Sequence, residues 1–220
     1  MRRLGFLIIG LLVVAFFARP SDEDVFWRWF TTNQERVFRF EADKQRVLDE
    51  ILAKLRAYRD GLVFEISIEK NGVREFIISA DGLKELLPSV TKLVSAAPTL
   101  QNWKFVAFRP RLDDYAQFSV EYAGQNYDPK EIWFFHRIED NSFDVIFYHP
   151  NFDQKNRDEI IASTYLMLDM ALGEYDVVTG LRYIDHQAMP KNPKAEGLRP
   201  FSDLRMVFDE FKKKKAQAMH

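Results

Sequence analysis

The pattern of hydrophobic and polar positions divides the first half of the chain into helical and extended segments. Hydrophobic residues recur at every third or fourth position in three stretches, which is typical of amphipathic helices that cover a sheet. Apolar and polar residues alternate on both sides of Asn71-Gly72, the strongest short signal for a β-hairpin. Pro88 falls inside the third helical stretch, where it restarts the helix. The predicted elements are helices over residues 22–37 and 42–58, strands over 62–69 and 73–79, a helix over 81–94 and a strand over 103–109.

The second half of the chain repeats this order of hairpin, helix and strand. A polar turn at 139–142 separates two strands, and Gly173 ends a long amphipathic helix that Asp153 begins. The halves share almost no residue identity, so the repetition is one of pattern alone. The sequence therefore predicts an α+β fold with a mainly antiparallel sheet covered by helices, with two pseudo-repeated hairpin–helix–strand (ββαβ) units as one possible arrangement. The predicted elements are strands over residues 118–122, 132–137 and 143–148, a helix over 153–172, a strand over 180–185 and a final helix that begins at Ser202.

An unbroken apolar run over residues 4–18 follows Arg2 and Arg3 at the start of the chain. Basic residues before an apolar run are typical of an export signal or a membrane anchor. As a helix the run would reach about 22 Å, short of the roughly 30 Å hydrocarbon core of a bilayer. Cleavage after Ala18 would place Phe16 where a small residue is favoured. We therefore expect an N-terminal hydrophobic helix that acts as a signal anchor and transmembrane helix.

The charges around this run predict where the rest of the chain lies. The arginines before the run stay in the cytoplasm, so we expect the globular part on the periplasmic or extracytoplasmic side of an inner membrane, held by a single pass. Cleavage of the signal would instead give a periplasmic or secreted protein. The predicted domains are a signal or anchor segment over residues 1–20, a single α+β domain over 21–215 with possible halves 21–112 and 113–215, and a tail over 216–220.

The composition of the chain excludes some classes of binding partner and some kinds of chemical site. Beyond residues 1–19 the chain carries 28 basic against 33 acidic residues, a net charge of −5, which argues against nucleic acid as the main partner. The absence of cysteine excludes disulfides, thiolate metal sites and cysteine nucleophiles. Twenty phenylalanines, eight tyrosines and four tryptophans predict a core or a binding surface rich in aromatic rings.

The common catalytic motifs are absent: there is no Gly-x-Gly-x-x-Gly after a strand, no Walker loop, no Gly-x-Ser-x-Gly and no His-Glu-x-x-His. One constellation is a candidate site. His149 and Asp153 follow one predicted strand, Glu174 and Asp176 follow the next helix, and His186 ends the following strand. Imidazoles with carboxylates suit a zinc or manganese site or acid–base catalysis. The alternative is structural, with Asp153 as a helix cap and the other residues in solvated turns and strand ends.

Three further residues are candidates for binding. Arg109 and Arg111, near Trp103 at a strand end, could hold an anion or a carboxylate-bearing ligand through their planar donor groups; a solvated strand end is the alternative. Trp27 lies about 200° around the predicted first helix from Trp29. If Trp29 is buried, Trp27 is expected to be exposed and available to a partner.

Several segments together carry a resemblance. They resemble a family of uncharacterised bacterial α+β proteins of unknown function, over about residues 25–212. The resemblance implies a stable bacterial domain and supplies no catalytic residue. The segments are 26–30 with Glu35 and Phe40, 77–82, 103–110 and 172–176.

These observations favour a non-enzymatic binding or protein-interaction module, held at or exported across the bacterial inner membrane, with no cofactor. Its expected partners are the membrane, through residues 4–18, and an unknown protein, but no nucleic acid. One alternative is a metal-dependent hydrolase that uses the histidine and carboxylate constellation. Another is an intracellular regulatory or toxin-antagonist protein, which would require that the apolar segment does not direct export.

Overall fold

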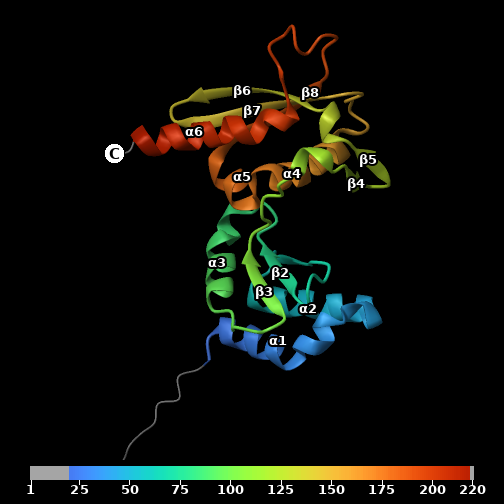
Figure 1. Ribbon diagram of the computed structural model, residues 1–220, viewed down its shortest axis with the longest axis vertical. Coiled ribbons are helices and arrows are strands. Elements are labelled where there is room, and N and C mark those ends of the chain that lie inside the picture. The colour runs from blue at the N-terminus through green and yellow to red at the C-terminus, as the bar shows by residue number, and fades with distance from the viewer. Residues whose placement is uncertain (1–19, 219–220) are drawn as a thin grey trace, which may run out of the picture.

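Six α-helices and two mixed β-sheets make up residues 20–218, the part of the chain that the computed structural model describes. This arrangement confirms the predicted α+β class. The elements form two units stacked along the long axis of the molecule (Figure 1), and each unit has its own cluster of buried hydrophobic side chains. Residues 20–109 are called the N-terminal unit and residues 110–218 the C-terminal unit.

In the N-terminal unit, three helices pack around a three-stranded sheet. Strands β1 and β2 form an antiparallel hairpin, and β3 returns through α3 to lie parallel to β2. Asn71 and Gly72 both have positive φ in the hairpin turn, as this pair of residues predicts. The elements are α1 (Asp22–Phe38), α2 (Lys44–Tyr58), β1 (Val63–Ile66), β2 (Arg74–Ser79), α3 (Leu87–Ser95) and β3 (Trp103–Ala107), with 3₁₀ turns at Phe40–Asp43 and Lys84–Leu86.

Aromatic side chains fill the core of this unit, and they correct one prediction. Trp27, expected to be exposed to a partner, is only 4% exposed, and its ring centroid lies 4.5 Å from that of Phe105. Trp29, expected to be buried, lies half-buried at the rim and donates its indole N–H to Glu50 of α2. The reason is that α1 packs against α2 on one side and α3 on the other, so it buries a wider arc than an amphipathic stripe implies.

In the C-terminal unit, helices cover one face of a four-stranded sheet, and α6 runs along the strands (Figure 1). Strands β6 and β7 form an antiparallel hairpin, β8 lies parallel to β7, and β9 pairs with the other side of β6. The elements are β4 (Val120–Tyr122) and β5 (Gln125–Tyr127), which form a separate ribbon, then β6 (Trp133–Glu139), β7 (Ser142–His149), α4 (Arg157–Leu172), α5 (Glu174–Gly180), β8 (Leu181–Ala188), β9 (Arg199–Pro200) and α6 (Leu204–Ala218), with 3₁₀ turns at Tyr115–Gln117, Pro129–Glu131 and Phe201–Asp203.

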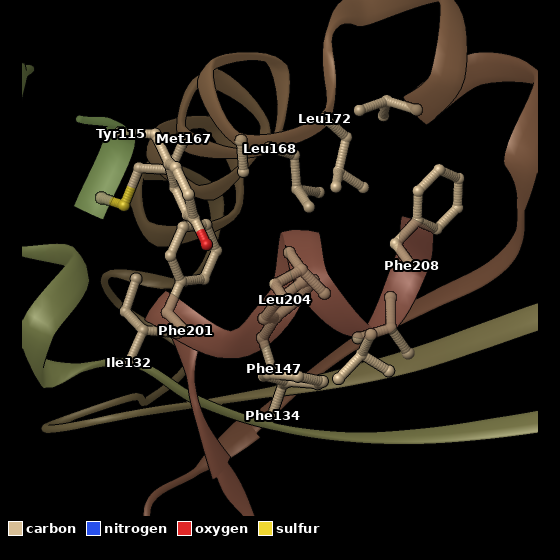
Figure 2. Close-up of a cluster of buried hydrophobic side chains, with 14 of the residues drawn as sticks. Tyr115, Ile132, Phe134, Phe147, Met167, Leu168, Leu172, Phe201, Leu204 and Phe208 are labelled. Atoms are coloured by element: carbon tan, nitrogen blue, oxygen red, sulfur yellow. The ribbon is translucent and has the colours of Figure 1, made fainter. Parts of the chain in front are cut away.

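Side chains from the sheet and from the helices meet in the core of the C-terminal unit (Figure 2). Phe134 and Phe147 pair across β6 and β7, and both are fully buried beneath Leu168 of α4 and Phe208 of α6. Gly180 ends α5 directly against this layer. A Cβ atom at Gly180 would lie 2.5 Å from Cζ of Phe208, so the close approach of α5 to α6 requires glycine.

Four of the six strand pairings in the described part of the chain are antiparallel. Each of the two larger sheets also has one parallel pairing, because the strand after each hairpin returns through a helical crossover and lies parallel to its neighbour. One detail of the fold differs from the prediction. Helix α4 begins at Arg157 with Asn156 before it, and not at Asp153. The carboxylate of Asp153 accepts the backbone N–H groups of Lys155 and Asn156, so it shapes the turn that precedes the helix.

The hydrophobic helix predicted over residues 4–18 lies outside the described residues. Within residues 20–218, no helix is both long and apolar enough to cross a membrane. As far as the described part of the chain goes, this finding contradicts the expectation of a transmembrane or signal-anchor helix.

Candidate functional site

A buried carboxylate joins the two units. Glu174, at the start of α5, is fully buried and accepts the backbone N–H of Ala80 at 2.8 Å and that of Arg109 at 3.0 Å. Its own backbone N–H donates to the carbonyl of Arg109 at 3.0 Å. Gly173, with φ near +80°, turns the chain between α4 and α5 and so directs Glu174 toward the N-terminal unit. The loops after β2 and β3 are thereby fixed to the first turn of α5.

Arg109 extends from this junction and contacts carboxylates from three other segments. Its guanidinium donates to Glu65 of β1 at 2.6 Å, to Asp81 after β2 at 3.2 Å and to Asp169 of α4 at 3.3 Å. Asp169 is the most enclosed of these three, with 12% of its side chain exposed, against 49% for Glu65 and 57% for Asp81. Three carboxylates therefore gather at one guanidinium, and a fourth, that of Glu174, accepts the backbone N–H of the same residue.

Burial and excess negative charge set the pKa values of this cluster. Burial raises the pKa of Asp169 to about 7, because the loss of water outweighs the attraction of Arg109 and because Glu174 adds repulsion. Burial alone would lower the pKa of Arg109, but hydrogen bonding and attraction to Glu65 raise it above its usual range. Asp169 can therefore exchange a proton near neutral pH while it lies inside the contact between the units.

Two hollows meet at the contact between Arg109 and Asp169, and we call them together the inter-unit cleft. The larger, of about 710 Å³, lies between the loop after β2 and the surfaces of α4, α5 and β8. The smaller, of about 490 Å³, lies between the outer face of β1 and β2 and helix α4. Arg109, Leu166 and Asp169 border both hollows, so the ion pair divides a space that the two units enclose.

Strand β8 forms the edge of the C-terminal sheet and one wall of the larger hollow. It pairs with β7 on one side, and within residues 20–218 its other edge has no neighbouring strand. At the start of the strand, the backbone N–H of Leu181 donates to the carbonyl of Val177 in α5. Leu181, Arg182 and Ile184 line the hollow from this strand. Arg182 is held in place by bonds of 2.8 and 2.6 Å to Asp144 of β7. A row of unpaired backbone groups therefore borders the cleft.

The two histidines of the predicted constellation lie together, away from the cleft. His149 on β7 and His186 on β8 bring Nε2 and Nδ1 to 3.0 Å from each other. Burial lowers the pKa of His149 to about 3 and that of His186 to about 4, so both rings are neutral near pH 7. Nε2 of His186 is buried and has no hydrogen-bond partner. An unpaired lone pair costs less free energy to bury than an unpaired N–H group. We therefore assign the shared proton to Nδ1 of His186.

The other three residues of that constellation lie elsewhere. Asp153 is in the turn before α4, Glu174 is at the junction of the units, and Asp176 bonds to Arg111 and Lys212. No group of three or more histidine, aspartate or glutamate side chains in the described part of the chain is placed to hold a metal ion. The fold therefore does not assemble these residues into one site.

The two arginines predicted to bind an anion are already bonded within the protein. Arg111 donates to Asp176 at 2.9 Å, to Asp209 at 3.0 Å and to the carbonyl of Leu172 at 2.7 Å. Arg109 bonds to three carboxylates, as described above. Both guanidinium groups bridge segments of the chain, and this geometry gives no support to a role in binding an anion.

Asp169 and the free edge of β8 were not predicted from the sequence. An aspartate within the apolar stretch 166–172 is a signal that could have revealed the first, because a charged residue in a buried helix segment requires a partner. The edge position of β8 follows from which strands pair, and the local sequence carries no signal for it.

Comparison with protein-family models, with curated proteins and with solved structures finds no match to this chain. The resemblance to uncharacterised bacterial α+β proteins therefore stays a prediction.

Proposed function

We propose that the protein is a protein-interaction module that binds an extended segment of a partner chain in the inter-unit cleft, by adding a strand to β8. The observation that carries this proposal is that β8, a strand of 8 residues with one unpaired edge, lines a hollow of about 710 Å³. An unpaired edge offers N–H and C=O groups that only another extended chain can satisfy in register. The cleft provides the space that such a chain needs.

The walls of the cleft indicate which side chains the segment carries. Leu166 of α4, Val177 and Val178 of α5 and Ile184 of β8 give the larger hollow an apolar surface. Successive side chains of a strand point to opposite sides, so every second residue of the bound segment faces this surface. We therefore expect apolar residues at alternate positions of the segment.

The charges favour a protein partner over a nucleic acid. Residues 20–220 carry a net charge of −5. In the larger hollow, Asp81 and Asp169 stand beside Lys84, Arg109 and Arg182, so the hollow is not a uniformly positive surface of the kind that phosphate groups require. A main-chain strand brings no net charge and is compatible with this mixture. An extended polypeptide is therefore the occupant that the edge and the charges support together.

We also infer that the two units are pseudo-repeats. Support comes from their common order of hairpin, helical crossover and parallel strand, with neighbouring strands in the orders β1-β2-β3 and β6-β7-β8. In this relationship β8 corresponds to β3, the other strand that ends a crossover at a sheet edge. Superposition of the two three-stranded sheets with their crossover helices tests this inference.

Selection of peptides from a random library displayed on phage tests the proposed function. We expect the selected peptides to have apolar residues at alternate positions. We also expect them to protect from hydrogen exchange those backbone amides within residues 181–188 that point away from β7. Ala162→Trp adds an indole to the wall of the larger hollow on α4, and it should weaken peptide binding about tenfold or more. Ala53→Trp adds the same ring at an exposed position of α2 and should leave binding unchanged.

Peptides that bind equally well to the Ala162→Trp variant would show that the cleft is not their site. Binding without protection of β8 would reject strand addition. Thermal unfolding of both tryptophan variants, compared with the parent, separates a lost site from a lost fold.

A further inference from the structure

Each unit buries its own hydrophobic core, and the units meet through polar contacts and a small apolar contact. Glu174 fixes the loops after β2 and β3 to α5, and Arg109 reaches across to Asp169 of α4. In the apolar contact, Phe108 lies against Tyr175 with ring centroids 5.3 Å apart, and Val178 packs against the N-terminal core. Units with separate cores can shift relative to one another about such a junction without unfolding. The width of the inter-unit cleft therefore depends on a small number of groups at this junction.

Asp169 is the group at this junction whose charge is most sensitive to the width of the cleft. Glu65 and Asp81 are about half exposed, so water screens their charges in any arrangement of the units. Glu174 is held by two backbone N–H groups. Asp169, with 12% of its side chain exposed, borders both hollows and has one side-chain contact, to Arg109 at 3.3 Å, so separation of the units would expose its carboxylate further.

We propose that Asp169 is a proton-operated latch between the two units: when protonated it stabilises the closed cleft, and when ionised it favours a wider cleft in which water reaches its carboxylate. Closure then takes up a proton, so acid shifts the equilibrium toward the closed form. The consequence for strand addition rests on the proposed function: neutral pH admits a segment to β8, and acid hinders its entry. The latch itself does not depend on that function.

Charged groups from each neighbouring segment contribute to this balance. Arg109 attracts the ionised form of Asp169, whereas the carboxylates repel it, and the pKa of Asp169, raised to about 7 by burial, places the change near neutral pH. Arg182 also borders the hollow, but it is paired with Asp144. The charged groups around the latch are Arg109 after β3, Glu65 on β1, Glu75 on β2, Asp81 and Lys84 after β2, Glu174 on α5 and Arg182 on β8.

The absence of cysteine makes a direct measurement of the unit-to-unit distance straightforward. Ala53→Cys on α2 and Lys213→Cys on α6 place two spin labels at exposed positions, one in each unit. In this labelled protein, without any peptide, we expect the population at longer distance in pulsed electron resonance to increase several-fold between about pH 5 and about pH 8. Asp169→Asn keeps the shape of the side chain without its charge. In this variant we expect the short distance between the two spin labels at every pH in this range.

Glu65→Gln is the matched control, because it removes a carboxylate from the same guanidinium at an exposed position, and it should retain the pH response. A distance distribution that does not change with pH in the parent would overturn the latch. An unchanged response in the Asp169→Asn variant would overturn it as well. Carboxyl NMR of ¹³C-labelled aspartate in the parent gives a second measurement, since the latch requires one aspartate to titrate near pH 7. These readouts need no ligand, so they are independent of whether β8 binds a peptide.

Discussion

The indole N–H of Trp27 donates to the backbone carbonyl of Leu93 at 2.7 Å. This bond joins the first helix of the N-terminal unit to the end of α3, across 66 residues of sequence. The carbonyl belongs to the last turn of α3, where it also accepts the backbone N–H of the C-cap residue Ala96 at 3.2 Å. Trp27 therefore contributes both packing and hydrogen bonding to the core.

Trp27→Ala should lower the free energy of unfolding by about 3–5 kcal/mol through the cavity and the lost hydrogen bond. Trp27→Phe keeps most of the packing and should cost less. Trp29→Phe, at the half-buried rim, serves as the control and should cost under about 1.5 kcal/mol. Urea unfolding measures all three, and a larger loss for Trp29 than for Trp27 would contradict the described orientation of α1.

Glu174→Ala should destabilise the protein by about 3 kcal/mol or more, because it leaves the N–H groups of Ala80 and Arg109 without an acceptor in a buried place. Glu174→Gln should be intermediate, since its amide group presents a donor to one of these two N–H groups. Asp176→Asn, two residues along at a more exposed ion pair, is the control and should cost under about 1 kcal/mol. Calorimetry measures the unfolding of each variant. If Glu174→Ala destabilises the protein no more than Asp176→Asn does, Glu174 does not link the two units.

Stability should fall as pH decreases from about 6.5, the ordinary histidine value, toward about 4. The pKa values of His149 and His186 are lowered in the folded protein to about 3 and about 4, so the unfolded chain takes up protons that the folded chain does not. Each histidine then contributes a loss of up to about 1.4 kcal/mol per pH unit. Urea midpoints across this range measure the slope, and the double variant His149→Phe/His186→Phe should flatten it.

Asp169 should act in the opposite direction over the same pH range. Its pKa is raised to about 7 in the folded protein, so the folded chain holds a proton that the unfolded chain releases, and this contribution to stability is present in acid and lost as pH rises through about 7. The contribution of Asp169 partly offsets the loss of stability that the histidines cause in acid, and Asp169→Asn removes it. The acid loss of stability should therefore become steeper in this variant, and an unchanged slope would argue against the buried, protonated state.

Gly180→Ala should cost about 1–3 kcal/mol, because the new Cβ atom would lie 2.5 Å from Cζ of the fully buried Phe208. The backbone at Gly180 does not have positive φ, so the loss of stability comes from the steric contact with Phe208 and not from backbone strain. In a double-mutant cycle, Phe208→Leu should relieve part of this cost. Additive effects of the two substitutions would show that the close contact is absent in solution.

Local signals in the sequence predicted much of the fold. Asn71-Gly72 indicated the first hairpin, Pro88 indicated a restarted helix, and Gly173 indicated the end of α4, because each residue has a conformational preference that acts within a few positions. The burial of Trp27 was not predicted, since spacing within one helix does not reveal that two other helices flank it.

The candidate site could be predicted only in part. His149 and His186 were placed together correctly because each ends a predicted strand of one ββαβ pattern. Glu174 was singled out, but its acceptor role depends on backbone groups 94 and 65 residues away, and spacing carries no information about them. The cleft itself arises from how two units meet, which no local pattern encodes.

The link through Glu174 also has a consequence for the order of synthesis. The ribosome completes residues 20–109, whose hydrophobic cluster forms the core of the N-terminal unit, long before it reaches Glu174. During that interval the N–H groups of Ala80 and Arg109 face water, and they are hydrated rather than bonded to the carboxylate. The nascent first half can thus fold early, but it acquires its final surface only when the second half docks. Translation pauses before α5 would prolong the period in which this surface is open to other chains.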